Sequence, residues 1–214
     1  MSITSLSVSC TDHGNNKRSN IAQPDRNTEN ESLSYKAFRL RFLFLITLII
    51  PLVQVLTAQT TGDFRTNGDV TFSSATNWER YNGSAWVEAD AAPVRTDGVI
   101  TIRAGNTAVL TSTISLDQII VASGGIFNIE TGRQLNLMNE PGVDLDVSGT
   151  LNNSGTINPA TGTTISFNAN SVYNHARNGS SIPDAAWAPE STCLISGVTT
   201  NVPTGLNQSF GNFS

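Results

Sequence analysis

Short apolar runs recur along residues 99–167 and are separated by turns rich in Gly, Asn, Thr and Ser. Within most runs apolar and polar residues alternate, which is the period-two pattern of a half-buried β-strand. No stretch of this range has the apolar spacing of an amphipathic helix. The runs read VITIRA, TAVLTS, QIIVAS, GIFNIE, RQLNLM, VDLDVS, TLNN and TTISFN. The pattern therefore predicts an all-β fold.

The runs also return at a rough period. One series of leading apolar residues has spacings of 19, 16, 16 and 14 residues, and a second has spacings of 18, 18, 12 and 16. The two series are Ile100, Ile119, Leu135, Leu151, Ile165 and Val109, Phe127, Leu145, Ile157, Tyr173. Such a repeat indicates stacked units that bury their apolar faces against each other. We predict a right-handed parallel β-helix (β-solenoid) with two strands per coil and coils that shorten along the chain. A β-sandwich is the alternative, because short alternating strands between frequent turns describe it too.

Glycine marks the turns between the runs. The residues concerned are Gly124, Gly125, Gly132, Gly142, Gly149, Gly155 and Gly162. Glycine adopts positive φ without steric cost, so we expect these residues to form the corners of the coils.

A signal peptide is predicted at residues 35–58. Three basic residues precede an apolar segment at 42–53, and polar and small residues follow it. The basic residues are Lys36, Arg39 and Arg41. This order of residues predicts cleavage between Ala58 and Gln59 and export to the medium or the cell surface. The apolar segment is shorter than the roughly 20 residues of a membrane-spanning helix, so we expect no stable membrane span after cleavage.

The remaining sequence divides by composition. Residues 1–34 are polar and aperiodic, so we expect disorder there, and we hypothesise that the true translation start lies further downstream. Residues 59–98 precede the repeats and are expected to form an N-terminal cap with a hairpin. Residues 99–175 hold the coils. Residues 176–214 are expected to form an insertion followed by a resumed coil with an incomplete end.

Two tryptophans flank a turn in the cap segment. Trp78 and Trp86 lie on either side of the turn residues 81–84, so we expect the two indoles to lie close together on paired strands. One interpretation is that they close the open end of the solenoid. The other is that they form a platform on which a sugar stacks.

Charge and cysteine content limit the partners. After Ala58 the chain has six arginines, no lysine and thirteen Asp or Glu residues, which gives a formal net charge of −7. Nucleic-acid binding depends on positive charge, so we expect no nucleic-acid partner. Cys193 is the only cysteine of this part, and nothing near it in sequence resembles a metal or nucleophile motif. We expect it to be a buried, unreactive thiol, and the alternative is that it pairs with a partner outside this chain.

Candidate chemical groups are sparse. Asp144 and Asp146 alternate along one run, which places both carboxylates on one strand face, where we expect solvent exposure rather than a calcium site. Further oxygens for such a site would have to come from Asp117, Glu130 or Glu140. His175, close to Tyr173, has no nucleophile beside it, so we expect a hydrogen-bonding loop residue. We assign no catalytic, cofactor-binding or metal-ligating residue.

The sequence resembles a known group of proteins. PVRTDGVITIRAGNTAVLT, SLDQIIVASGGIFNIETG and VDLDVSGTLNNSG are similar to the eight-glycine domain and to related β-helix starts in large exported proteins of Bacteroidetes. The resemblance covers residues 62–214. It implies the N-terminal part of a longer, surface-displayed, adhesin-like protein. Such proteins commonly end in a sorting domain for type IX secretion, for which this chain has no room, so we expect a continuation.

Two functions remain open at this point. The first is a non-enzymatic, secreted or cell-surface β-helix scaffold within a larger protein. The second is a carbohydrate-binding or polysaccharide-processing, lyase-like module, whose partner would be an extracellular glycan or a host or environmental surface. Candidate glycan contacts are Trp78, Trp86, Tyr173, His175 and Trp187. Conceivable bases for a lyase reaction are Arg103, Arg133 and Arg177.

Overall fold

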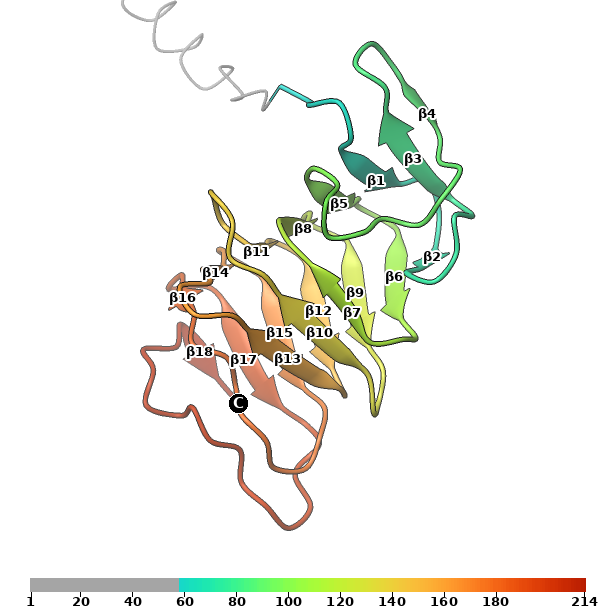
Figure 1. Ribbon diagram of the computed structural model, residues 1–214. Coiled ribbons are helices and arrows are strands. Elements are labelled where there is room, and N and C mark those ends of the chain that lie inside the picture. The colour runs from blue at the N-terminus through green and yellow to red at the C-terminus, as the bar shows by residue number, and fades with distance from the viewer. Residues whose placement is uncertain (1–57) are drawn as a thin grey trace, which may run out of the picture. The chain divides into compact units, whose positions relative to one another are not determined.

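The computed structural model describes residues 58–214. All regular secondary structure in this range is β-strand (Figure 1). The range contains no helix that could cross a membrane. Residues 1–34 and residues 35–57 of the predicted signal peptide lie outside the described residues. Ala58 and Gln59, the predicted cleavage residues, are described and exposed.

The strands form three sheets. Sheet A contains β1 (Phe64–Thr66), β3 (Trp78–Tyr81), β4 (Trp86–Glu88), β5 (Ile100–Ile102), β8 (Ile119–Val121), β11 (Leu145–Val147), β14 (Ile165–Phe167) and β16 (Ala186–Trp187). Sheet B contains β2 (Val70–Thr71), β6 (Thr107–Leu110), β9 (Ile126–Ile129), β12 (Thr150–Asn153), β15 (Val172–His175), β17 (Thr192–Ile195) and β18 (Asn212–Phe213). Sheet C contains β7 (Ile114–Leu116), β10 (Gln134–Leu137) and β13 (Thr156–Pro159).

The coils from β5 to β13 visit sheets A, B and C in turn, and the later strands β14 to β17 alternate between sheets A and B. The stacked parallel strands form a β-solenoid of about five turns. All strand pairs are parallel except β1 with β3 and β3 with β4. In sheet A, Ile100 pairs with Ile119, which pairs with Leu145, which pairs with Ile165. The prediction of a solenoid is confirmed. The alternative of a β-sandwich is wrong, because a sandwich is built from antiparallel strands.

The predicted internal repeat is wrong in its details. The coils from β5 to β13 have three strands each rather than two, whereas the coil that begins at β14 has two. The paired positions of sheet A are 19, 26 and 20 residues apart, so the coils do not shorten steadily. The predicted series joined residues of different sheets: Ile119 lies in β8, Leu135 in β10 and Leu151 in β12. All three sheets use the same apolar-x-apolar unit, so the sequence pattern does not distinguish one side of a coil from another.

Alternate residues of each strand point inward and stack on their counterparts in the next coil. In sheet A, for example, Ile102, Val121, Val147 and Phe167 form one continuous buried row. Burying each such side chain contributes about 1.5–3 kcal/mol relative to leaving it exposed. The core therefore runs along the axis of the stack instead of forming a single central cluster.

The N-terminal end of the core is closed by aromatic side chains. Trp78 is fully buried, and its ring lies 5.2 Å from the ring of Phe72 and 6.3 Å from that of Phe64. Trp78 thus packs at the end of the core, as the cap interpretation expects, whereas Trp86, which was given the same role, lines an outer cleft. Strands β1 and β2 already belong to the stack, because they pair in parallel with β5 and β6.

The corner glycines serve two different purposes. Gly124 has φ of 80°, as predicted for a corner. Gly125, Gly149 and Gly155 are not among the positive-φ residues, so that expectation is wrong for them. A β-carbon at Gly149 would clash with the carbonyl oxygen of Gly125 one coil earlier. Glycine is required at position 149 because the backbones of two coils approach each other closely.

Residues 176–185, which were expected to leave the stack, connect β15 to β16 in register with the following coil. Ser181 forms a parallel bridge with Thr204, and the Ile182 amide donates to the Thr204 carbonyl oxygen at 3.0 Å. The side-chain oxygen of Asn178 accepts hydrogen bonds from three successive amides of the next coil, at residues 199–201. This segment thus extends the solenoid.

Candidate functional site

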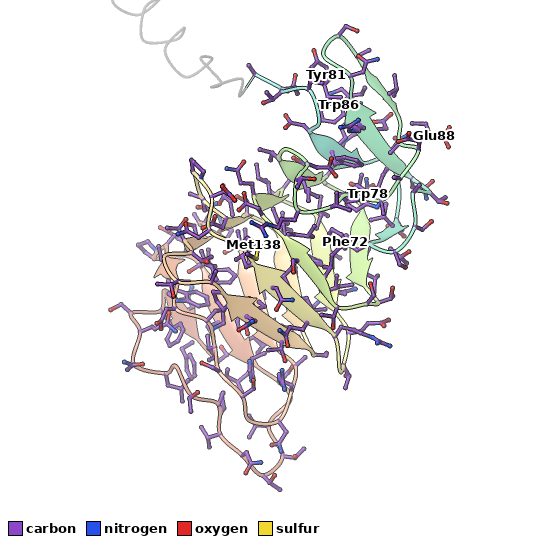
Figure 2. All side chains as sticks on the ribbon, in the orientation of Figure 1. Phe72, Trp78, Tyr81, Trp86, Glu88 and Met138 are labelled. Atoms are coloured by element: carbon purple, nitrogen blue, oxygen red, sulfur yellow. The ribbon has the colours of Figure 1, made fainter. Side chains whose placement is uncertain are left out.

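An aromatic pair lies on the outer face of the β3–β4 hairpin. Tyr81 pairs with Trp86 across the two strands, and their ring centroids are 5.4 Å apart. Cross-strand partners share one face of a sheet, and alternate residues of a strand share it too, so Glu79 lies on the same face. Trp78 occupies the opposite, inner face. Figure 2 shows Tyr81 and Trp86 near the free end of the hairpin and Trp78 closer to the stack.

Two arginines surround the carboxylate of Glu79. The Arg65 Nε donates to Glu79 Oε2 at 2.6 Å, and Arg103 Nη1 lies 4.0 Å from the same oxygen. The Arg65 guanidinium also lies over the indole of Trp86, 4.3 Å from the ring centroid. Such cation–π contacts and charge-assisted hydrogen bonds fix side-chain orientation. Trp86, Arg65 and Glu79 therefore form one interlocked group.

A cleft of about 430 Å³ opens beside this group, and we call it the Trp86 cleft. It is lined by Ala58, Gln59, Thr60, Asp63, Arg65, Trp86, Val99, Thr101, Arg103 and Ile120. The floor follows one outward row of sheet A, because Arg65 pairs with Thr101 and Thr101 pairs with Ile120. Asp63 holds one wall in place by accepting the Thr60 amide at 2.7 Å and the Val99 amide at 2.9 Å. The volume of the Trp86 cleft is in the range of small-ligand sites.

The five candidate glycan contacts are not brought together. Trp78, Tyr173 and His175 are fully buried, so they are not accessible to a glycan in solution. Trp187 is partly buried at the other end of the core and stacks on Phe167, with ring centroids 4.2 Å apart. Only Trp86 lines the cleft.

The expected closeness of the two hairpin indoles is also wrong. The loop between β3 and β4 comprises residues 82–85, which places Tyr81 rather than Trp78 opposite Trp86. The side-chain oxygen of Asn82 closes this loop by accepting the Ser84 and Ala85 amides, both at 3.0 Å. Tyr81 was predicted as a turn residue, and its pairing with Trp86 was therefore missed. Asn82, which begins the loop, was the signal that could have set the register of the hairpin.

His175 forms hydrogen bonds, as expected, but it lies fully buried on strand β15 and not in a loop. Its Nε2 lies 2.7 Å from the Gly179 carbonyl oxygen, so that nitrogen donates and Nδ1 accepts from the Tyr173 hydroxyl at 3.2 Å. The Asn153 amide donates to the same hydroxyl at 3.0 Å. Burial lowers the pKa of His175 and raises the pKa of Tyr173 to about 12. Both groups are therefore neutral and act within the core.

Cys193 is a buried free thiol on β17. Burial raises its pKa to about 11, so the nucleophilic thiolate is scarce at neutral pH. The prediction of a buried cysteine is confirmed.

The acidic pair differs from the predicted one. Asp144 is fully buried, whereas Asp146 is only partly buried on β11 and accepts a hydrogen bond from the Asn168 side chain. The prediction that both carboxylates share an exposed strand face is therefore wrong. Asp144 faces Asp117 from the next coil corner instead, and the two are linked by a side-chain hydrogen bond. Among residues 58–214, no three His, Cys, Asp or Glu side chains are placed to bind a metal together.

The environments of Asp117 and Asp144 move their pKa values in opposite directions. Burial, followed by the contact with Asp144, raises the pKa of Asp117 to about 6. Burial also pushes the pKa of Asp144 upward, but hydrogen bonds outweigh it, so the pKa is lowered. These bonds come from the Thr164 amide at 2.6 Å, the Thr164 hydroxyl at 3.2 Å and the Glu140 amide at 3.2 Å. Below about pH 6, Asp117 therefore holds the proton of the pair and Asp144 the charge.

The three conceivable lyase bases lie apart. Arg103 lines the Trp86 cleft, Arg133 is exposed, and Arg177 donates to the Gly155 carbonyl oxygen and to the Thr156 hydroxyl. Arginine remains protonated in proteins, and Arg103 Nη1 lies 4.0 Å from the Glu79 carboxylate. The arrangement at the cleft is thus suited to binding rather than to proton abstraction.

Comparison with protein-family models, curated proteins and solved structures returned no match to this chain.

Proposed function

We propose that the chain is a non-enzymatic scaffold segment of a larger secreted or cell-surface protein, of the adhesin-like kind that its sequence resembles. The supporting observation is that outward positions of successive coils bond to each other. On sheet B, the Asn152 side chain donates to Asn128 at 2.9 Å and the Asn174 side chain donates to Asn152 at 3.3 Å. The Ser196 hydroxyl extends this row by donating to Asn174 at 2.6 Å.

This asparagine row supports a scaffold because it stabilises the stack from outside the core. Adjacent strands lie about 4.8 Å apart, and the amide groups of asparagine side chains in successive coils can bridge this spacing with hydrogen bonds. Inward-facing side chains of successive coils pack in the core, and outward-facing asparagines form hydrogen bonds along the axis of the stack. Both features stiffen a rod that holds other segments away from a surface.

The export part of this proposal is tested on intact cells of the source organism. Brief protease treatment should degrade the chain from outside, and N-terminal sequencing of the untreated protein should begin at Gln59. Recovery of protease-protected chains that retain residues 1–58 would contradict it. Release of reducing ends from polysaccharides by the purified protein would contradict the non-enzymatic part.

A second candidate function is carbohydrate binding at the Trp86 cleft. The observation that favours it is the partly exposed indole of Trp86, fixed by Arg65 and placed beside Thr101 in a cleft of ligand size. Aromatic rings pack against the C–H faces of sugars, while neighbouring polar groups bond the hydroxyls. A glycan array probed with the full chain and with Trp86→Ala tests it. Glycan signals that persist in Trp86→Ala would reject the cleft as the binding site.

A further inference from the structure

The charges of the Trp86 cleft balance, although the chain as a whole is acidic. Arg65, Arg103 and Asp63 line the cleft, and Glu79 lies beside it, bonded to Arg65 and 4.0 Å from Arg103. Together these four side chains contribute two positive and two negative charges. After Ala58 the chain has only six arginines, so this one cleft holds a third of them. The cleft is therefore neither a cationic patch nor part of the general acidic surface.

Each carboxylate of the cleft is already bonded. The Glu79 carboxylate accepts from Arg65 and lies 4.0 Å from Arg103. The two oxygens of Asp63 accept backbone amides at 2.7 and 2.9 Å. An incoming carboxylate would have to compete with Glu79 for the guanidinium groups and would meet its negative charge. Hydroxyl groups meet no such penalty, because they donate to a carboxylate and accept from a guanidinium.

The Trp86 cleft also offers an aromatic surface beside its charged groups. Trp86 is partly exposed, Tyr81 braces its ring at 5.4 Å, and the Arg65 guanidinium projects over it. A sugar ring has apolar C–H faces and a rim of hydroxyls. An indole beside a guanidinium–carboxylate pair offers complementary apolar and polar contacts to these two parts of the ring.

We infer that the Trp86 cleft binds a neutral saccharide, with Trp86 against the C–H face of the sugar and the Arg65–Glu79 pair bonded to its hydroxyls. This inference rests on the second proposed function, carbohydrate binding, and specifies its ligand class. Glu79 acts here as the residue that sets specificity, because its charge discourages acidic sugars.

The test compares neutral and acidic probes by titration calorimetry on the full chain. The neutral probes are hexasaccharides of β-linked glucose and of galactose, and the acidic probe is a hexasaccharide of galacturonate. The wild type should bind at least one neutral probe roughly tenfold more tightly than the acidic one. Its affinity for the neutral probe should change little between low and physiological salt, since no net charge is paired.

Two pairs of variants assign the contacts. Trp86→Ala should weaken neutral binding by roughly tenfold or more, whereas Val87→Ala, on the same strand but on the opposite face, should leave it unchanged. Glu79→Gln should weaken neutral binding and strengthen galacturonate binding, because it leaves two guanidinium groups without their carboxylate. Glu130→Gln, at an exposed glutamate outside the cleft, removes the same charge and is the matched control.

The outcomes separate the inference from the function it rests on. Tighter binding of galacturonate than of both neutral probes by the wild type would overturn the neutral-sugar inference while leaving carbohydrate binding in place. Failure of all three probes to bind would reject both. Circular dichroism of each variant establishes that a loss of binding is not a loss of folding.

Discussion

Asp117 and Asp144 share a hydrogen bond between their side chains at successive corners of the solenoid, and both residues are at least nine-tenths buried. One oxygen of Asp117 has no hydrogen-bond partner. The pair is stable when it carries one proton, because two buried carboxylates in contact repel each other. This arrangement makes the stability of the fold sensitive to pH.

The pH dependence has a definite sign. The folded-state pKa of Asp117 is about 6, above its ordinary value of 3.8, so its contribution to stability is complete below about pH 4 and is lost as the pH rises through 6. Asp117→Asn imitates the protonated carboxyl group. We predict that Asn at this position raises the melting temperature at pH 7.5 by roughly 3–6 °C and makes little difference at pH 4.

Calorimetric melting of both proteins from pH 4 to 8 checks this prediction. The difference between variant and wild type removes the contribution of His175, which titrates in both proteins, and reports on Asp117 together with its partner Asp144. The pKa values of His175 and Asp144 are lowered, so these two residues act in the opposite direction and lose their contributions as the pH falls. Glu130→Gln, at an exposed corner, is the control. A destabilised Asp117→Asn protein at pH 7.5 would contradict the shared proton.

Gly149 is predicted to be intolerant of any side chain. A β-carbon there meets carbonyl oxygens of Ala122 and Gly125, which belong to rigid corners of the preceding coil. We expect Gly149→Ala to cost more than about 2 kcal/mol in the free energy of unfolding, because the two coils must separate. In Gly132→Ala the β-carbon meets no atom within 4 Å, and only the positive φ of 75° is unfavourable, so about 1 kcal/mol is expected.

Urea denaturation of the two glycine variants provides the comparison. Equal losses would show that conformational preference, and not the close approach of coils, explains both residues.

Trp78 and Trp86 should respond differently to truncation. Trp78 fills the end of the core against Phe72, so Trp78→Ala is expected to cost about 3–5 kcal/mol. Trp86→Ala should cost less than about 1 kcal/mol, since the residue lies on an outer face. Chemical denaturation followed by circular dichroism measures both, and a larger loss for Trp86 would contradict their assignment to cap and cleft.

The sequence contained enough information for the strands and the solenoid but not for the assignment of strands to sides. Alternation along runs such as VDLDVS predicts strands because one face of each is buried. It does not reveal that Leu145 stacks on Ile119 while Leu135 stacks on Ile114, since both sheets use the same alternation. The 26-residue step between Ile119 and Leu145 further hides the period.

The sequence predicted the candidate site only in part, for a similar reason. The two tryptophans were visible in the sequence, but their roles depend on the register of one hairpin. A shift of a single residue moves a side chain to the other face of a sheet. Arg65 and Glu79 are 14 positions apart and adjoin only because β1 pairs with β3, so their contact could not be predicted from spacing.

Hydrogen–deuterium exchange with the neutral hexasaccharides tests most directly whether function resides at the Trp86 cleft. The full chain is labelled with and without a neutral probe that binds in calorimetry, or with both at millimolar concentration if neither does. We predict slower exchange in peptides that cover residues 58–65, 86–88 and 99–103, and no change around Tyr173, His175 and Trp187. Slower exchange confined to residues 172–195, or no change anywhere in the chain, would contradict the account.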